Sequence, residues 1–170
     1  MNNDHGFTLL EMLVSIAIIA MMSIVLSQVF ISTIRTNTKT EILKEVKQNG
    51  DAAIESITRI VQNAQSVTCP TPQSLAMVNP DGDTTTLGCT VDGTTRLSST
   101  DAIGTVYLTS KSVSLGATCA STLLFTCEEV SGLPSHVTVS FSLVQKGTPG
   151  DKFEKASESF QTRVTMRNNP

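Results

Sequence analysis

The first part of the chain is a long apolar run that starts directly after one acidic residue. Residues 12–34 contain no charged side chain, and Glu11 precedes them. In a helix that rises ~1.5 Å per residue, this run spans ~34 Å, enough to cross a hydrocarbon core of about 30 Å. An ionisable side chain at the edge of a membrane segment is costly and usually functional. The pattern therefore predicts a membrane-spanning helix in which Glu11 needs a partner.

Beyond the apolar run, the pattern becomes that of an amphipathic helix. Apolar residues recur at spacings near three, four and seven, and polar side chains fill the other faces. The apolar stripe consists of Ile42, Val46, Ala53, Ile57, Ile60, Val61 and Ala64. Together, the two segments predict one helix from about Thr8 to Ala64, with its second half packed on a sheet. We expect a kink or restart at Gly50 and Asp51, because glycine costs about 1 kcal/mol relative to alanine in a helix interior.

The rest of the chain shows short strands and turns. Pro70 and Pro72 end the helical pattern. Residues 79–83 form a strong turn signal, and Asp92-Gly93 is expected to be a two-residue hairpin loop. Strands are expected at 75–78, 84–91, 94–98, 105–109, 113–115, 123–126, 137–143 and 160–167. The last two alternate apolar and polar residues, as in an antiparallel sheet with one face on a helix. The fold class is therefore α+β, a long N-terminal helix packed on a C-terminal antiparallel sheet.

Composition and motifs argue against several functional classes. The net charge is −3, so the chain lacks the basic footprint of a nucleic-acid-binding protein, and no direct contact with nucleic acid is expected. No nucleophile-elbow, zinc-protease or phosphate-loop motif occurs, and the only histidines are His5 and His136. We therefore do not expect an enzyme or a bound cofactor.

Four cysteines, Cys69, Cys89, Cys119 and Cys127, all follow the apolar run. An even number of cysteines outside the cytoplasm favours disulfides, and four allow three pairings. The preferred pairing joins sequence neighbours, Cys69 with Cys89 and Cys119 with Cys127, because each bridge would close a short loop. The alternative is free, buried cysteines in a reducing compartment.

No metal site is expected. The cysteines lack the Cys-x-x-Cys spacing of structural zinc sites. Asp81, Asp83 and Asp92 lie in turn-like segments, but the regular oxygen spacing and later glutamate of an EF-hand loop are absent. These aspartates are better explained as turn-forming residues.

The N-terminal motif carries a specific family resemblance. Gly6-Phe7-Thr8-Leu9-Leu10-Glu11, opening a long uncharged run, resembles the prepilin motif of type IV pilins and type II secretion pseudopilins. The resemblance implies that a membrane peptidase cleaves between Gly6 and Phe7 and N-methylates Phe7. It also implies that Glu11 directs assembly into a helical filament. The expected organisation is a leader peptide (1–6), a transmembrane and filament-core helix (7–34), an amphipathic helix (35–66) and a globular β-rich domain (67–170).

The same resemblance implies where the chain acts and with what. The expected partners are sibling pilin or pseudopilin subunits, the prepilin peptidase, the inner-membrane assembly platform and, before assembly, membrane lipid. The chain would cross the cytoplasmic (inner) membrane once and later join a periplasmic or cell-surface filament. Its size and its cysteine-containing β region favour a minor subunit. Its leader departs from the usual pattern, because residues 1–5 contain no Lys or Arg to hold the N-terminus in the cytoplasm.

Two other functions remain open at this point. In the first alternative, the chain is a signal-anchored surface protein that keeps its leader and never enters a filament, and its β-rich domain binds a ligand or a host surface. It is a competence pseudopilin if its filament serves DNA uptake.

Overall fold

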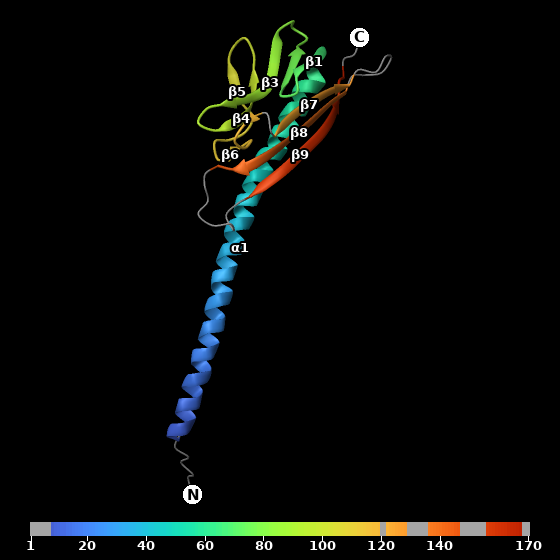
Figure 1. Cartoon of the computed structure of the whole chain (residues 1–170). Coiled ribbons are helices and arrows are strands. Elements are labelled where there is room, and N and C mark those ends of the chain that lie inside the picture. The colour runs from blue at the N-terminus through green and yellow to red at the C-terminus, as the bar shows by residue number, and fades with distance from the viewer. Residues whose placement is uncertain (1–7, 120–121, 129–135, 147–155, 168–170) are drawn as a thin grey trace. The chain divides into compact units, whose positions relative to one another are not determined.

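Helix α1 (Leu9–Asn63) is the longest element of the chain. The computed structural model describes residues 8–119, 122–128, 136–146 and 156–167. The chain divides into two units, Met1–Thr38 and Lys39–Pro170, and α1 begins in the first and ends in the second (Figure 1). The predicted helix from Thr8 to Ala64 is thus confirmed to within one residue at each end.

The first sheet of the second unit is an antiparallel meander, in which each strand pairs with its neighbours in sequence. Its order is β1-β2-β3-β4-β5. The strands are β1 (Ser66–Thr71), β2 (Ser74–Val78), β3 (Thr84–Val91), β4 (Thr95–Thr100) and β5 (Thr105–Tyr107). Positive φ angles at Gly82 and Gly93 allow the two sharp turns on either side of β3.

The second sheet is built around one long central strand. Its strands are β6 (Val113–Ser114), β7 (Leu123–Glu128), β8 (His136–Gln145) and β9 (Ser157–Thr165). Val144 of β8 pairs with Ser157 of β9 on one edge and with Ser114 of β6 on the other. Strand β7 pairs with the earlier part of β8, so β6 and β7 follow one another along that same edge. The α+β class is confirmed, with two antiparallel sheets where one was expected.

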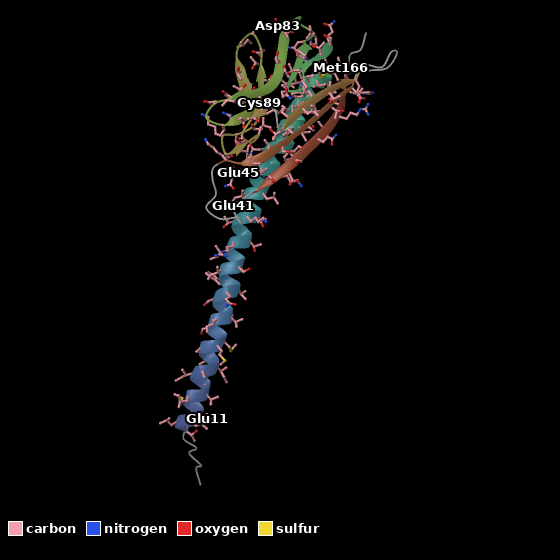
Figure 2. The ribbon with its side chains drawn as sticks, in the orientation of Figure 1. Glu11, Glu41, Glu45, Asp83, Cys89 and Met166 are labelled. Atoms are coloured by element: carbon pink, nitrogen blue, oxygen red, sulfur yellow. A yellow bond between two sulfur atoms is a disulfide. The ribbon has the colours of Figure 1, made fainter. Side chains whose placement is uncertain are left out.

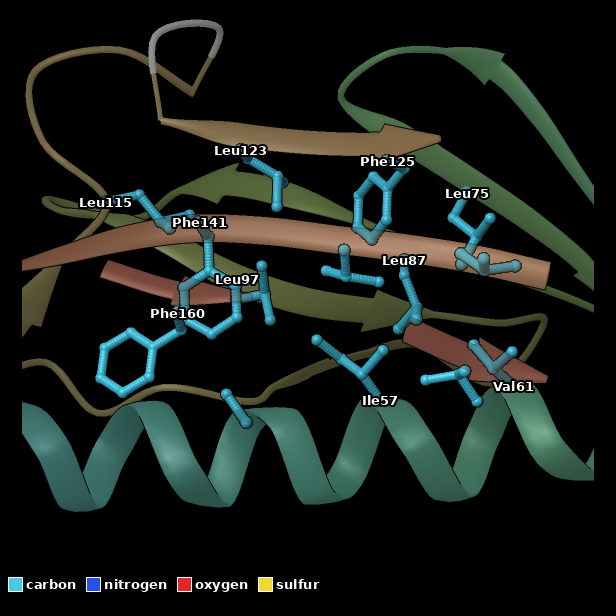
Figure 3. Packing of buried hydrophobic residues seen from close by; sticks show 14 of the residues in the cluster. Ile57, Val61, Leu75, Leu87, Leu97, Leu115, Leu123, Phe125, Phe141 and Phe160 are labelled. Atoms are coloured by element: carbon cyan, nitrogen blue, oxygen red, sulfur yellow. The ribbon is translucent and has the colours of Figure 1, made fainter. Parts of the chain in front are cut away.

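The core of the second unit lies between α1 and the two sheets. Val46, Ala53, Ile57 and Val61 form the buried stripe of the helix at spacings of seven, four and four, and buried side chains of both sheets cover it. Figure 3 shows Ile57 and Val61 pointing from the helix toward the strands. On the second sheet, the rings of Phe141 and Phe160 stack with centroids 5.3 Å apart. The predicted amphipathic stripe is therefore the core face of the helix.

The expected restart of the helix at Gly50 and Asp51 is wrong. Helix α1 continues through Gly50 and Asp51 without a break. Gly50 is buried, and a Cβ atom there would lie 2.1 Å from the Cζ of Phe160 on β9. The glycine therefore makes room for an aromatic ring, and the stability lost through its poor helix propensity is offset by close packing.

Two local expectations about the strands also need correction. The segment containing Pro70 is not only a helix terminator but part of strand β1, which lies at the edge of its sheet, where proline is tolerated. Its pairing with β2 shifts register between Thr68 and Thr71, around this proline. The β3–β4 hairpin has a three-residue loop instead of two, because Val91 pairs with Thr95.

The preferred disulfide pairing is wrong as well. The bridges join Cys69 to Cys127 and Cys89 to Cys119. Cys69 and Cys89 lie on β1 and β3, which are separated by β2. Two strand spacings amount to about 9.6 Å, whereas bridged Cα atoms lie within about 7 Å. Strand β7 lies beside β1, and Phe125 N donates to the carbonyl oxygen of Pro72, directly after β1, at 2.7 Å. Cys127 is therefore the cysteine within reach of Cys69.

We predict that replacing Gly50 with alanine destabilises the second unit. The added methyl group overlaps the ring of Phe160, and such overpacking typically costs about 1–3 kcal/mol. Chemical denaturation of the detergent-solubilised full chain, followed by circular dichroism, measures the loss. Gly50→Ala combined with Phe160→Leu should recover much of it. A gain of about 1 kcal/mol from Gly50→Ala alone would show that helix propensity outweighs the contact.

A second prediction concerns the disulfides. Trypsin cuts after Arg59, Arg96, Lys111 and Lys146, which places Cys69 and Cys89 in peptide 60–96 and the other two cysteines in peptide 112–146. Mass spectrometry of an unreduced digest should find these peptides joined by two bridges. Further cleavage at Met77 and Phe125 should then separate the pairs Cys69–Cys127 and Cys89–Cys119. Two unconnected peptides, each with an internal bridge, would contradict the structure.

Candidate functional site at the start of the helix

The first turn of α1 is built by Thr8 and Glu11. The backbone N–H of Glu11 points at Thr8 and lies 3.3 Å from its Oγ1 and 3.1 Å from its carbonyl oxygen. Threonine is a favoured N-cap because its side-chain oxygen accepts from an otherwise unpaired N–H of the first turn. Glu11 lies where a negative charge complements the helix dipole. No described side chain contacts its carboxylate, so these residues leave it available to a partner outside the described structure.

The helix that follows is apolar on every side. Leu, Ile, Val, Met and Phe side chains of residues 9–34 have exposed fractions from 51% (Ile31) to 80% (Leu9). Figure 2 labels Glu11 at the start of this segment. An 18-residue window of α1 has a mean hydropathy of 2.5 with none of it buried, so α1 is long and apolar enough to cross a membrane. A helix that is hydrophobic all round normally lies in a membrane or in the interior of a larger assembly.

The hydroxyl groups of this segment fit an apolar surrounding. Each of four side chains donates to the carbonyl oxygen four residues earlier in the helix, at distances from 2.7 to 2.9 Å. These residues are Ser15, Ser23, Ser27 and Thr33. Because these donors are satisfied within the helix, they carry a smaller penalty in hydrocarbon than unpaired hydroxyls would. The carboxylate of Glu11 is the only charged side chain in the same segment.

The other predicted site residues lie outside this segment. Gly6 and Phe7, the residues of the expected cleavage and methylation, lie outside the described residues. The four cysteines are all bridged in the second unit. Within the described ranges, no group of three or more His, Cys, Asp or Glu side chains is placed to hold a metal ion.

The aspartates considered for calcium have other contacts. Asp81 Oδ1 accepts from the backbone N–H of Asp83 at 3.1 Å, within the turn before β3. Asp92 lies in the β3–β4 loop, with Oδ2 3.4 Å from Lys111 Nζ and 3.7 Å from Arg96 Nη1. These contacts give both residues a structural role in their turns.

Comparison with known proteins assigns the N-terminal segment. Residues 1–27 match the family model of the prokaryotic N-terminal methylation motif. The chain carries the N-terminal motif of type IV pilins and pseudopilins. Its long helix packed on antiparallel sheets is a pilin-like α+β arrangement, and proteins of the pilin-like family are typically structural. No curated protein sequence and no solved structure matches the chain.

The cap formed by Thr8 was missed in the sequence analysis, although a signal for it exists. Thr8-Leu9-Leu10-Glu11 fits the capping-box pattern, in which Ser or Thr is followed three residues later by Glu or Gln. Glu11 therefore contributes to the stability of the helix itself in this prepilin-like chain, because an acidic residue in the first turn interacts favourably with the helix dipole. Glutamine also completes a capping box, so capping alone does not require a charge.

We predict that a charge at the centre of the apolar run prevents membrane insertion, whereas loss of a hydroxyl does not. Ser23 lies midway along residues 12–34, and its hydroxyl is satisfied by Ile19 O. Ser23→Asp should make insertion less favourable by about 2.5–3.5 kcal/mol, and Ser23→Ala should leave it unchanged. Carbonate extraction of membranes measures the inserted fraction. Release of the wild-type chain by carbonate would show that this segment is not inserted as a spanning helix.

Proposed function

We propose that the chain is a structural subunit of a type IV pilus or a type II secretion pseudopilus. Its leader is removed between Gly6 and Phe7, Phe7 is N-methylated, and the mature helix is inserted in a filament of sibling subunits. Before assembly, the helix resides in the cytoplasmic (inner) membrane; afterwards, it forms part of the filament core. The supporting observation is the apolar N-terminal helix with one carboxylate in its first turn, within the matched motif.

The apolar surface explains why such a helix moves between lipid and protein. Fully burying one large aliphatic side chain contributes about 1.5–3 kcal/mol relative to water, and residues 9–34 expose many of them. Lipid tails and the side chains of a helix bundle cover this surface about equally well. Hydrophobicity alone therefore does not select the filament over the membrane, and a further interaction is needed.

Glu11 supplies that interaction in the proposed function. Cleavage after Gly6 creates an α-amine on Phe7, which is largely cationic at neutral pH. The amine and the carboxylate are four residues apart, one turn along the helix. Pairing the amine of one subunit with Glu11 of the next compensates both charges and sets an axial stagger of about 6 Å. An unpaired carboxylate in hydrocarbon costs several kcal/mol, which favours assembly over the isolated membrane state.

The β-rich unit and its two disulfides support a minor subunit as the specific role. One bridge links β1 to β7 of the other sheet, and the second links β3 to the segment between β6 and β7. Such cross-links stabilise a domain once it is outside the reducing cytoplasm. The same feature supports a final location in the periplasm or on the cell surface.

We predict that removing the charge of Glu11 prevents incorporation into filaments. Glu11→Ala and Glu11→Gln should each reduce the amount of the chain in sheared filaments at least ~10-fold, which corresponds to ~1.4 kcal/mol. Glutamine preserves the capping box and isolates the effect of the charge. Immunoblots of filament and membrane fractions measure the split, and mass spectrometry of the wild-type chain should find methylated Phe7 at its N-terminus.

The controls separate this proposal from the alternatives. Glu11→Asp keeps the charge and should retain more incorporation than glutamine. Normal incorporation of Glu11→Gln would show that the carboxylate acts only through helix capping. An intact Met1 on the exported chain would indicate a signal-anchored surface protein. The ratio of this chain to sibling subunits in the same filaments tests the minor role, and normal filaments with impaired DNA uptake in a deletion strain would indicate competence.

A further inference from the structure

Strand β9 forms a long free edge of the second sheet. Among the described strands it pairs only with β8, and the register runs from Ser157 to Thr165 without a shift. Figure 1 shows β9 as the outermost strand on its side of this sheet. The first sheet also has a free edge at β5, but that strand has only three residues. The edge of β9 is therefore a larger surface than β5 for the addition of a further strand.

The hydrogen bonds of β8 show which backbone groups of β9 point toward the free edge. Gln145 N donates to Ala156 O at 3.1 Å, so these two residues form a hydrogen-bonded pair. In an antiparallel ladder, such pairs alternate with pairs whose N–H and C=O groups point away from each other. Accordingly, Ser142 N donates to Thr122 O and not to Ser159, its partner on β9. The residues of β9 whose N–H and C=O groups point away from β8 are therefore Ser157, Ser159, Gln161, Arg163 and Thr165.

The outward-pointing backbone groups of β9 are open to a partner. None of them has a hydrogen-bond partner within the described part of the chain. Three of the five side chains contact neighbouring strands instead of covering the edge. The contacts join Ser159 to Ser142 (Oγ–Oγ, 2.9 Å), Thr165 to His136 (Oγ1–Nδ1, 3.0 Å) and Arg163 to Glu128 (Nη2–Oε2, 2.8 Å). These side chains point across the sheet, so they do not occupy the backbone groups of the edge.

The strand also lacks the usual protection of an edge. Native edge strands are commonly guarded by proline, lysine, a bulge or an inward-pointing charge. The nine residues of β9 include neither proline nor lysine, and the pairing with β8 has no bulge. Glu158, at the beginning of the strand, is the one charged residue that alternates with the core residues Phe160 and Val164. From Ser159 onward, the edge therefore remains able to pair with an extended chain.

The flank of α1 beside this edge carries aliphatic side chains. Gly50 of α1 packs against the ring of Phe160, so this flank of the helix faces β9. Ile54, four residues later, lies on the same flank and is half-buried, and Leu43, seven residues before Gly50, is 39% exposed. A strand added beside β9 would direct every second side chain toward this flank. Aliphatic residues at those positions would extend the core.

We propose that the outer edge of β9 binds an extended segment of another protein, which joins the second sheet as an antiparallel strand. All described pairs in this sheet are antiparallel, and antiparallel pairing is slightly more stable per residue. Hydrogen bonds from the main chain of β9 hold the segment, and its alternate side chains set the preference. Segment residues bonded to Ser159, Gln161 and Arg163 lie on the hydroxyl-rich outer face, which favours threonine or serine. The residues between them face α1, which favours valine or isoleucine.

A second copy of the chain fits this edge less well than another protein does. Antiparallel pairing of two β9 strands requires a two-fold axis perpendicular to the strands. Figure 1 shows β9 running alongside the second half of α1, so this axis turns the two α1 helices in opposite directions. Two chains that are held in one membrane by residues 9–34 have these helices in the same direction. The edge itself lies wholly in the second unit, so its test does not depend on filament assembly.

Fluorescence anisotropy of the detergent-solubilised full chain with a short peptide tests the edge. The probe is fluorescein-Gly-Thr-Val-Thr-Val-Thr-amide, titrated with protein. In the proposed antiparallel pairing, the threonine N–H groups of the probe face β9 and the valine N–H groups face away. N-methylation of the three threonines should therefore weaken binding at least ~10-fold. N-methylation of the two valines should leave the affinity within about twofold.

A proline variant tests the same hydrogen bonds from the side of the protein. Gln161→Pro removes one outward N–H but no hydrogen bond to β8, and proline is tolerated at a sheet edge. It should weaken probe binding about tenfold. The matched control is Thr105→Pro, which removes an outward N–H from the edge of β5 and should leave the affinity unchanged. Circular dichroism and a disulfide digest confirm that each variant is folded.

Hydrogen exchange followed by NMR gives a second readout. In the free chain, the N–H groups of Gln161 and Arg163 should exchange faster than those of Phe160 and Thr162, which face β8, and the probe should protect them. Slow exchange of Gln161 and Arg163 without the probe would overturn the proposal, because the edge would already be paired within the chain or with a second copy. Equal binding of the two methylated probes, or no binding at about 1 mM protein, would also overturn it.

Discussion

The structure depends on one constraint: residues 9–34 of α1 present apolar side chains in every direction, and the described residues of the first unit bury none of them. Water is a poor solvent for such a surface, so this segment requires lipid or other protein around it. The internal hydrogen bonds of Ser15, Ser23, Ser27 and Thr33 lower the polar cost of that transfer. The charge of Glu11 adds a further cost, which an apolar medium tolerates only with compensation.

The same helix meets a different requirement in the second unit, where only a narrow stripe is apolar. Val46, Ala53, Ile57 and Val61 have exposed fractions of 1% or less, and the other faces carry charged and amide side chains. Gly50 interrupts this stripe in the sequence but not in the structure, because the ring of Phe160 occupies the space of its missing side chain. One continuous helix thus serves two surroundings through a change in residue pattern alone.

Local patterns predicted what depends on near neighbours in sequence. Strand β3 has the predicted bounds, and β8 alternates buried and half-buried residues because its apolar side chains recur every second position. Three features were not predicted, because each depends on how distant parts of the chain come together. The role of Gly50 depends on Phe160, and the disulfide pairing depends on β7 lying beside β1. Strand β1 was missed because Pro70, a helix terminator by itself, is tolerated at a sheet edge. For the N-terminal site, the family model supports the motif, whereas the assembly role of Glu11 stays a prediction, and Gly6 and Phe7 lie outside the described structure.

The negative charge of Glu11 is informative because the first turn of α1 does not need it for stability. Thr8 already caps the first turn, and an uncharged glutamine would complete the same capping box as Glu11. The favourable interaction of a carboxylate with the helix dipole is typically 0.3–1 kcal/mol, well below the several kcal/mol that an unpaired carboxylate costs in hydrocarbon. Stabilisation of the first helical turn therefore does not offset the free-energy cost of placing the Glu11 carboxylate next to a run of 23 uncharged residues. In the proposed function, a cation from outside the described structure would offset it, and cleavage after Gly6 would create one on every mature copy of the chain.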